Sequence, residues 1–186
     1  MKPWLNAKDL EDLKNGDALM VRTKSIGGAI IRLRSHSPWN HVGIIACTNF
    51  GKKPLVDVIE AVMENPVHRK SIYWYLAQPE KYTLSVYRNK RLDDLQRRNF
   101  VNMAMIYVGE GYDTRGLLGF NLIGRYLRRG KKNPFQKEEL KFCSELYTLV
   151  MKKFTKFLTK ITDPAKAAPG DIPRDPTMTF IAGARL

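Results

Sequence analysis

The chain has little cysteine, and this scarcity excludes whole classes of protein. Its two cysteines, Cys47 and Cys143, lie 96 positions apart in 186 residues. Domains built on disulfides usually carry four or more cysteines, so we expect two reduced thiols, with a single Cys47–Cys143 disulfide as the alternative. Closely spaced CxxC or HxxxH pairs are also missing. We therefore expect no metal site and no cofactor.

Long apolar runs are absent as well. No stretch reaches the roughly 18 apolar residues of a membrane-spanning helix, and the opening "MKPWLNAKDLEDLKNGD" has no apolar core of the kind that a secretion signal needs. We therefore expect a protein of the cytoplasm or of a phage or virus. The length suits one domain, residues 1–186, with a Pro-rich C-terminal tail from about residue 163.

Acidic residues are few relative to basic ones. The chain has 32 Lys and Arg against 18 Asp and Glu, a formal net charge of +14. Such a field attracts anionic partners, among them an anionic polymer or a membrane surface. No helix-turn-helix, RNP or zinc-finger sequence accompanies the basic segments, so we expect no specific nucleic-acid recognition. The sequence leaves the oligomeric state open.

Hydrophobic spacing predicts the order of the elements. The pattern is typical of strands at 17–23, 41–47, 55–62 and 82–88, and of helices at 6–15, 24–35, 92–109 and 142–158. It further predicts a glycine-containing helix at 113–130, a charged loop at 131–139 and a mostly extended tail at 163–186. Helices segregated from a small antiparallel sheet make an α+β fold.

Two of the predicted strands form a hairpin that pairs a base with a carboxylate. A turn at 50–51 places His41 opposite Glu60, and directly opposed side chains are close neighbours. A carboxylate on one ring nitrogen fixes the tautomer and leaves the other nitrogen to accept a proton from a nucleophile. Asp57 and Asn40 are alternative orienting residues, although Asp57 falls on the opposite face in this register.

The nucleophile of this arrangement is predicted to be Cys143. In "KFCSEL" it occupies the first turn of a helix, where unpaired backbone N–H groups and the helix dipole favour a thiolate. The alternative is a small, inert residue on a buried helix face. Cys47 lies in a predicted strand, and we expect it to be an inert residue of the core. His36 and His68 lack a carboxylate partner, and we assign them surface or turn roles.

Five blocks of sequence carry a resemblance to a known family. In order, "GDALMVRTKS", "SPWNHVGII", "VIEAV", "KFCSELYTLVM" and "PGDIPRDP" resemble the permuted papain-like amidases of the YiiX and YaeF group, relatives of the NlpC-type cell-wall peptidases. The likeness spans roughly residues 16–176. It implies a circularly permuted papain-like (NlpC-type) fold and a thiol amidase or peptidase that works through a thioester acyl-enzyme. It also implies His41 as general base, Glu60 as its orienting residue and Cys143 as nucleophile.

The resemblance further implies a peptide-like or acylated small substrate, with a cell-wall-derived peptide as one possibility. Tyr112, in "GYDTRG", and Ser144, next to the nucleophile, are the expected substrate-binding residues. One alternative keeps the fold and makes the chain a lipid acyl hydrolase or acyltransferase. Those relatives carry an "NCEHF"-like motif where this chain has "FCSEL". The other alternative is a non-catalytic polyanion-binding protein of a phage or virion.

Overall fold

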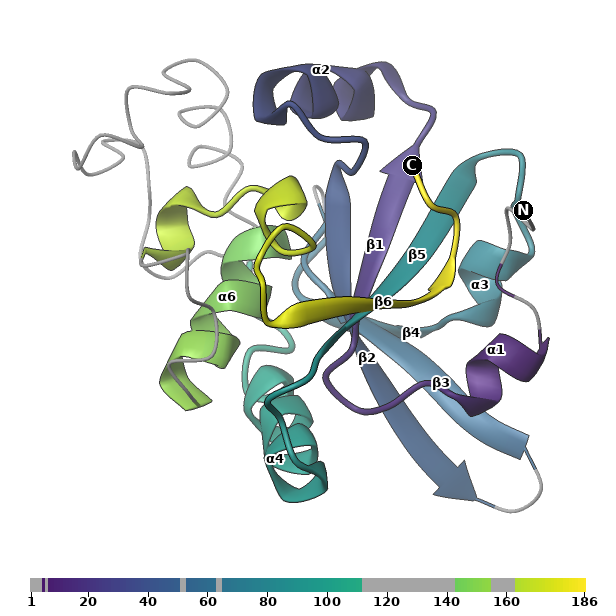
Figure 1. Cartoon of the computed structure of the whole chain (residues 1–186), viewed down its shortest axis with the longest axis vertical. Coiled ribbons are helices and arrows are strands. Elements are labelled where there is room, and N and C mark those ends of the chain that lie inside the picture. The colour runs from purple at the N-terminus through teal and green to yellow at the C-terminus, as the bar shows by residue number, and fades with distance from the viewer. Residues whose placement is uncertain (1–4, 6, 51–52, 63–64, 112–142, 155–162) are drawn as a thin grey trace.

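The computed structural model describes residues 5, 7–50, 53–62, 65–111, 143–154 and 163–186 (Figure 1). Its strands are β1 (Ala18–Thr23), β2 (His41–Phe50), β3 (Lys53–Glu60), β4 (His68–Ser71), β5 (Tyr82–Asn89) and β6 (Met178–Gly183). Its α-helices are α1 (Ala7–Glu11), α2 (Ile26–Ser35), α3 (Tyr73–Leu76), α4 (Asp94–Met105) and α6 (Cys143–Phe154). Short 3-10 helices occupy Pro164–Lys166 and Pro169–Asp171.

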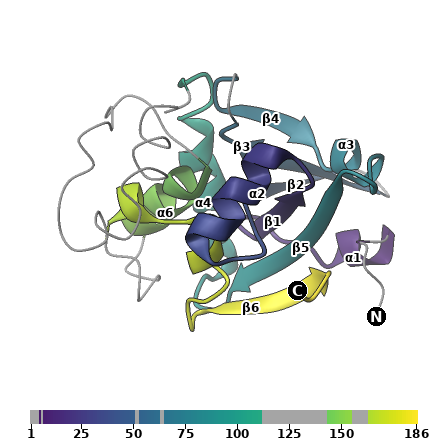
Figure 2. The same cartoon turned by 90° about the horizontal axis from the view of Figure 1, so that it is seen from above.

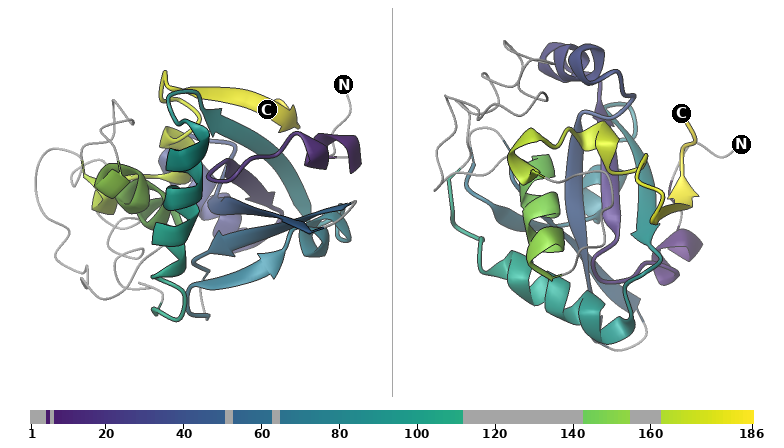
Figure 3. Two further views of the ribbon diagram at one scale, coloured as in Figure 1. Left: turned by 90° about the horizontal axis from the view of Figure 1, so that it is seen from below. Right: turned by 60° about the vertical axis from the view of Figure 1, so that its left-hand side comes forward.

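The strands form one antiparallel sheet in the order β4-β3-β2-β1-β5-β6. Side chains alternate between the two faces of a strand, and both faces of β1 are buried: Ala18 and Met20 pack with α4 and α6, while Leu19 and Val21 pack with α1 and α3. Figures 2 and 3 show these helices on opposite sides of the sheet, with β6 along one edge. The structure is thus the predicted α+β fold.

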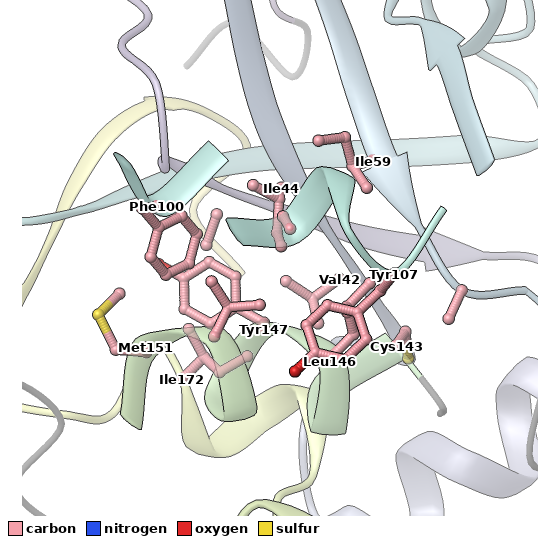
Figure 4. Packing of buried hydrophobic residues seen from close by; sticks show 14 of the residues in the cluster. Val42, Ile44, Ile59, Phe100, Tyr107, Cys143, Leu146, Tyr147, Met151 and Ile172 are labelled. Atoms are coloured by element: carbon pink, nitrogen blue, oxygen red, sulfur yellow. The ribbon is translucent and has the colours of Figure 1, made fainter. Parts of the chain in front are cut away.

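Helix α6 packs against α4 through a buried aromatic pair (Figure 4). The Tyr147 ring lies 5.5 Å from the Phe100 ring of α4, centroid to centroid, and both side chains are fully buried. The Tyr147 hydroxyl also donates a hydrogen bond of 3.2 Å to the carbonyl of Gly16. Gly16 has φ +79°, a left-handed conformation that glycine adopts at little cost. These contacts of Tyr147 hold the N-terminal half of α6 in position.

Most predicted elements lie where the sequence placed them, but two helices are shorter: the one predicted at 92–109 spans Asp94–Met105, and the first helix also ends early. The helix predicted at 6–15 ends at Glu11. The reason is Asp17, whose carboxylate accepts the backbone N–H of Lys14 at 2.9 Å while its own N–H donates to the Lys14 carbonyl. Residues 14–17 therefore make a turn into β1 instead of a last helical turn.

The hairpin of β2 and β3 has a different register from the predicted one. Ile45 pairs with Val58, not with Val56 as a turn at 50–51 requires, and the connection lies at 51–52. The register is shifted by two residues, which places Glu60 across from Gly43 and diagonal to His41. A shift of two keeps every side chain on its predicted face because the strand period is two.

Five of the described elements were not predicted, two of them the 3-10 helices Pro164–Lys166 and Pro169–Asp171 in the C-terminal tail. β4 and α3 follow the hairpin, and β6 lies within the tail that was predicted to be mostly extended. β4 has the sequence "HRKS" with alternate residues exposed, so it lacks the apolar alternation of a strand signal. The helix and loop predicted at 113–130 and 131–139 lie outside the described residues. No helix in the described ranges is long and apolar enough to cross a bilayer.

Candidate active site

His41 and Glu60 meet at the end of the sheet where β2 begins and β3 ends. His41 Nε2 lies 2.6 Å from Glu60 Oε2, and Glu60 is completely buried. Gly43 follows His41 by two residues on β2 and lies across from Glu60 on β3, and it carries no side chain. A Cβ there would lie 3.7 Å from Glu60 Cβ and 2.3 Å from Val58 Cγ1. Val58 therefore requires the glycine, because its methyl group occupies the space that a side chain at position 43 would fill.

Three further groups surround the Glu60 carboxylate. The Tyr75 hydroxyl donates to Oε2 at 2.5 Å, Lys70 Nζ lies 2.8 Å from Oε1, and His68 Nε2 lies 3.5 Å from Oε1. Burial by itself raises the pKa of this carboxyl. The contacts with His41, Lys70 and Tyr75 outweigh burial and lower the pKa of Glu60 to about 2. Glu60 is therefore fully ionised at neutral pH.

Lys70 is itself held by an aromatic cradle. Its ammonium lies 3.8 Å from the centroid of the Trp74 ring and 5.0 Å from that of Tyr75, both within cation–π range. Sequence reasoning found Glu60 but missed Lys70, Tyr75 and the approach of His68. His68 and Lys70 are two residues apart, so in a strand they lie on the same face. This spacing could have placed them near Glu60 only if the pairing of β4 with β3 had been known.

Cys143 is the first residue of α6 and completes the group. It is 6% exposed, and its thiol is hydrogen-bonded to His41. Burial would raise its pKa, but the charge and hydrogen bond of His41, with the backbone N–H groups of Val42 and Ser144, lower the pKa of Cys143 below its ordinary value. Figure 4 shows Cys143 at the start of α6. The sulfur is thus placed to exist as a thiolate.

The imidazole responds in the opposite direction. Burial would lower the pKa of His41, yet the adjoining Cys143 and Glu60 raise it to about 10. Since Nε2 is engaged with Glu60, the nitrogen left for the sulfur is Nδ1. The lowered pKa of the thiol and the raised pKa of the ring both favour a thiolate beside an imidazolium, with an ionised carboxylate behind it. That state supplies a nucleophile and an acid together.

The second cysteine has the contrary environment. Cys47 lies on β2, its backbone N–H donates to Asn15 at 2.6 Å, and its thiol lies 3.5 Å from the Leu13 carbonyl oxygen. Burial and the nearby charge of Asp17 raise its pKa to about 12. Both cysteines are free. Cys47 is therefore an unreactive thiol, but it is half-buried and packs against the core on the α1 and α3 side of the sheet, instead of being a fully buried core residue as predicted.

The other candidate residues are placed as follows. The Ser144 hydroxyl is buried and donates to the Ala167 carbonyl at 2.6 Å, so only its backbone N–H can serve a substrate. Tyr112 lies outside the described residues. Asp57, an alternative orienting residue, pairs with Arg69 at 2.5 Å. Asn40, the other alternative, accepts the Thr23 N–H and a bond from Arg32.

Comparison with known proteins gives a likeness at the level of the fold. No protein family matches the sequence, and no curated protein matches it. Among solved structures, the chain is similar to the crystal structure of the metalloprotein YiiX from Escherichia coli O157:H7, with a TM-score of 0.66 and 19% identity. The match covers 92% of this chain and 97% of that one. The chain therefore has a YiiX-like fold.

The description of YiiX as a metalloprotein raises the question of a metal here. Within the described ranges, no three His, Cys, Asp or Glu side chains are grouped so that they could hold a metal ion. Glu60, the fully buried carboxylate of the site, is already engaged by His41 and by the Lys70 ammonium 2.8 Å away, and that ammonium repels a further cation. The described residues therefore do not fit a metal centre.

Proposed function

We propose that the chain is a cysteine hydrolase of the permuted papain-like, NlpC-related type, an amidase or peptidase. Its substrate in this proposal contains an amide bond in a small peptide-like or cell-wall-derived molecule. The observation that carries the proposal is the buried contact of Cys143 with His41, which lowers the pKa of the thiol and raises that of the imidazole to about 10. The order of the sequence blocks and the YiiX-like fold support it.

The reaction begins with attack of the Cys143 thiolate on the carbonyl carbon. A C–S bond forms and the carbonyl oxygen becomes an oxyanion, which a backbone N–H such as that of Ser144 at the α6 N-terminus can stabilise. His41, as imidazolium, gives its proton to the leaving nitrogen, and the C–N bond breaks. A thioester and a neutral imidazole remain, with Glu60 holding the ring in position.

Water completes the cycle. Neutral His41 removes a proton from water, which adds to the thioester carbonyl carbon. The C–S bond then breaks, the product leaves as a carboxylic acid that loses its proton, and the thiolate–imidazolium pair is restored. Glu60 stays ionised throughout, because its pKa of about 2 lies far below the working range. An ester would react by the same steps, with an alcohol as the leaving group.

Alkylation with iodoacetamide tests the nucleophile without a known substrate. At pH 6.5 an ordinary cysteine with a pKa near 8.5 is only about 1% thiolate, whereas the imidazolium of His41 lowers the pKa of Cys143 and so raises its thiolate fraction. We expect Cys143 to alkylate at least about tenfold faster in the wild type than in His41→Ala. Peptide mapping by mass spectrometry reports Cys143 and Cys47 separately, so Cys47 is the internal control. A Cys143 no faster than an unperturbed thiol would refute the activated nucleophile.

Turnover tests the reaction class. The protein is incubated with a panel of peptide amides and esters, and intact mass is recorded for an acyl adduct. We expect the adduct in the wild type and in neither Cys143→Ala nor His41→Ala, with unchanged circular dichroism. A reactive thiol without any adduct or product would confine the failure to the choice of substrate. An unreactive thiol together with salt-sensitive DNA binding would favour the polyanion-binding alternative.

A further inference from the structure

Helix α2 presents its apolar side chains to solvent. The residues Ile26, Ile30 and Leu33 are 84%, 49% and 74% exposed. At 100° per residue these positions fall within about 60° of arc, so they lie on one side of the helix. We call these three side chains the α2 stripe. Large aliphatic groups exposed together in this way are a mark of an interaction surface.

The side of α2 that faces the protein is held mainly by polar contacts, although Ile31 on that side is half-buried. Gly28 is buried, and a Cβ there would lie 2.3 Å from the Thr23 hydroxyl oxygen. Arg32 Nη1 donates to the Thr23 carbonyl at 2.5 Å and to Asn40 Oδ1 at 3.1 Å, and Ser35 is 2% exposed. Surface helices normally place the apolar face inward. In α2, the hydrogen bonds of Arg32 hold one side of the helix against the protein, and the side with Ile26, Ile30 and Leu33 faces solvent.

The surroundings of the stripe are cationic. Between Asp17 and Asp57 the sequence contains no acidic residue. Lys24 is exposed immediately before the helix, and Arg22 is close enough to Arg32 for its charge to add to burial in lowering the Arg32 pKa.

The C-terminal end of α2 receives a further cation from elsewhere in the chain. Arg174, an exposed residue of the C-terminal segment, donates a hydrogen bond to the carbonyl of His36, which caps the helix. Cations therefore border the stripe at both ends.

We propose that α2 docks onto an anionic lipid bilayer. Its apolar stripe would enter the boundary between headgroups and acyl chains while the bordering cations meet lipid phosphates. A second copy of this chain fits less well, because a symmetric contact would bring the Arg22, Lys24 and Arg32 cations of both copies together. Nucleic acid would leave the aliphatic side chains uncovered.

The position of α2 gives the docking a consequence for the candidate active site. The helix lies beyond the end of β1 and before the start of β2, at one end of the molecule (Figures 1 and 3). Five residues, 36–40, separate it from His41, and Arg32 bonds Asn40 within that connection. Docking would hold the start of β2 near the membrane surface. The proposal itself does not depend on thiol chemistry, so Cys143→Ala should bind lipid like the wild type.

Vesicle co-sedimentation of the full chain tests the proposal. We expect binding to vesicles of phosphatidylcholine mixed with phosphatidylglycerol, weaker binding at high salt, and little binding to phosphatidylcholine alone. The double variant Ile26→Ser/Leu33→Ser should partition at least about tenfold more weakly, because two aliphatic side chains no longer enter the bilayer. The matched control is Leu55→Ser/Leu95→Ser, two leucines of β3 and α4 that are 54% and 59% exposed. This control should bind like the wild type.

Several results would overturn the proposal. One is equal binding by the Ile26→Ser/Leu33→Ser variant and its control, since general charge attraction would then suffice. Another is a wild-type dimer in light scattering that the double variant dissociates, which would make the stripe a contact between copies. A fall in melting temperature confined to the double variant would mean that the protein itself covers the stripe. Loss of DNA binding without loss of vesicle binding would assign the surface to nucleic acid.

Discussion

Replacing Glu60 with glutamine tests the electrostatics of the candidate site. Glutamine keeps the shape of the side chain and removes its negative charge. Glu60 Oε2 lies 2.6 Å from His41 Nε2 in a fully buried position. A hydrogen bond to a charged group contributes about 1.5–3 kcal/mol and a neutral one about 0.5–1.5 kcal/mol, so the replacement removes about 1–2 kcal/mol from the imidazolium.

This energy sets the size and direction of the expected change in pKa. A carboxylate favours the protonated ring, so its loss lowers the pKa of His41. Since 1.36 kcal/mol corresponds to one pKa unit, the pKa should fall from about 10 to about 9 or below. Lys70, left without its counter-ion 2.8 Å away, acts in the same direction. Turnover at high pH should fall with the imidazolium, because the leaving group then lacks its proton donor.

The assay is a pH titration of the histidine ring nitrogens by ¹⁵N NMR, which distinguishes imidazolium from neutral imidazole. The three histidines are assigned with single substitutions of His36 and His68. Asp57→Asn is the matched control. Asp57 lies on β3, the same strand as Glu60, but its carboxylate pairs with Arg69 and not with His41. It should leave the His41 pKa unchanged. The reasoning fails if His41 titrates at the same pH in Glu60→Gln as in the wild type, or near 6.5 in the wild type.

Two further predictions concern stability. Gly43→Ala should lower the free energy of unfolding by about 1–3 kcal/mol, because its Cβ would lie 2.3 Å from buried Val58. Gly27→Ala has open space around it and should raise the free energy of unfolding by about 0.5–1 kcal/mol. Urea melts of both variants measure these changes. Glu60 has a folded pKa of about 2 against an ordinary value of 4.5, so its contribution of about 3 kcal/mol should be present above pH 4.5 and lost as pH falls towards 2. Urea melts across this range should lose that part of the acid dependence in Glu60→Gln, and an unchanged dependence would contradict the shift.

The sequence predicted the members of the candidate site better than their arrangement. Alternation with a period of two put His41 and Glu60 on one face of a hairpin, and any even shift of register preserves that. The register itself depends on the connection at 51–52, where the residues "GK" fit more than one turn. The pairing of these strands also needs Gly43, because Val58 occupies the space that a Cβ there would take. Periodicity carries no information about such a constraint.

The remaining differences come from contacts between distant segments. Lys70 reaches Glu60 because β4 pairs with β3, and Tyr75 of α3 reaches it through its hydroxyl. The sequences of β4 and α3 have no strong pattern that would predict a strand or a helix. β6 is a strand because it adds to the edge of β5. For α2, periodicity groups Ile26 with Leu33 but does not determine which side faces solvent. The polar contacts of Arg32 decide that.

The base and the carboxylate come from one hairpin, whereas the sulfur arrives on a separate helix. The His41–Glu60 pair is built by neighbouring strands, but the position of Cys143 depends on how α6 is held by Tyr147 and Ser144. Any loosening of that helix would withdraw the sulfur while the hairpin stayed whole. Loss of the reactive thiol on warming should accordingly precede melting of the strands, so inactivation and unfolding would be two separate events.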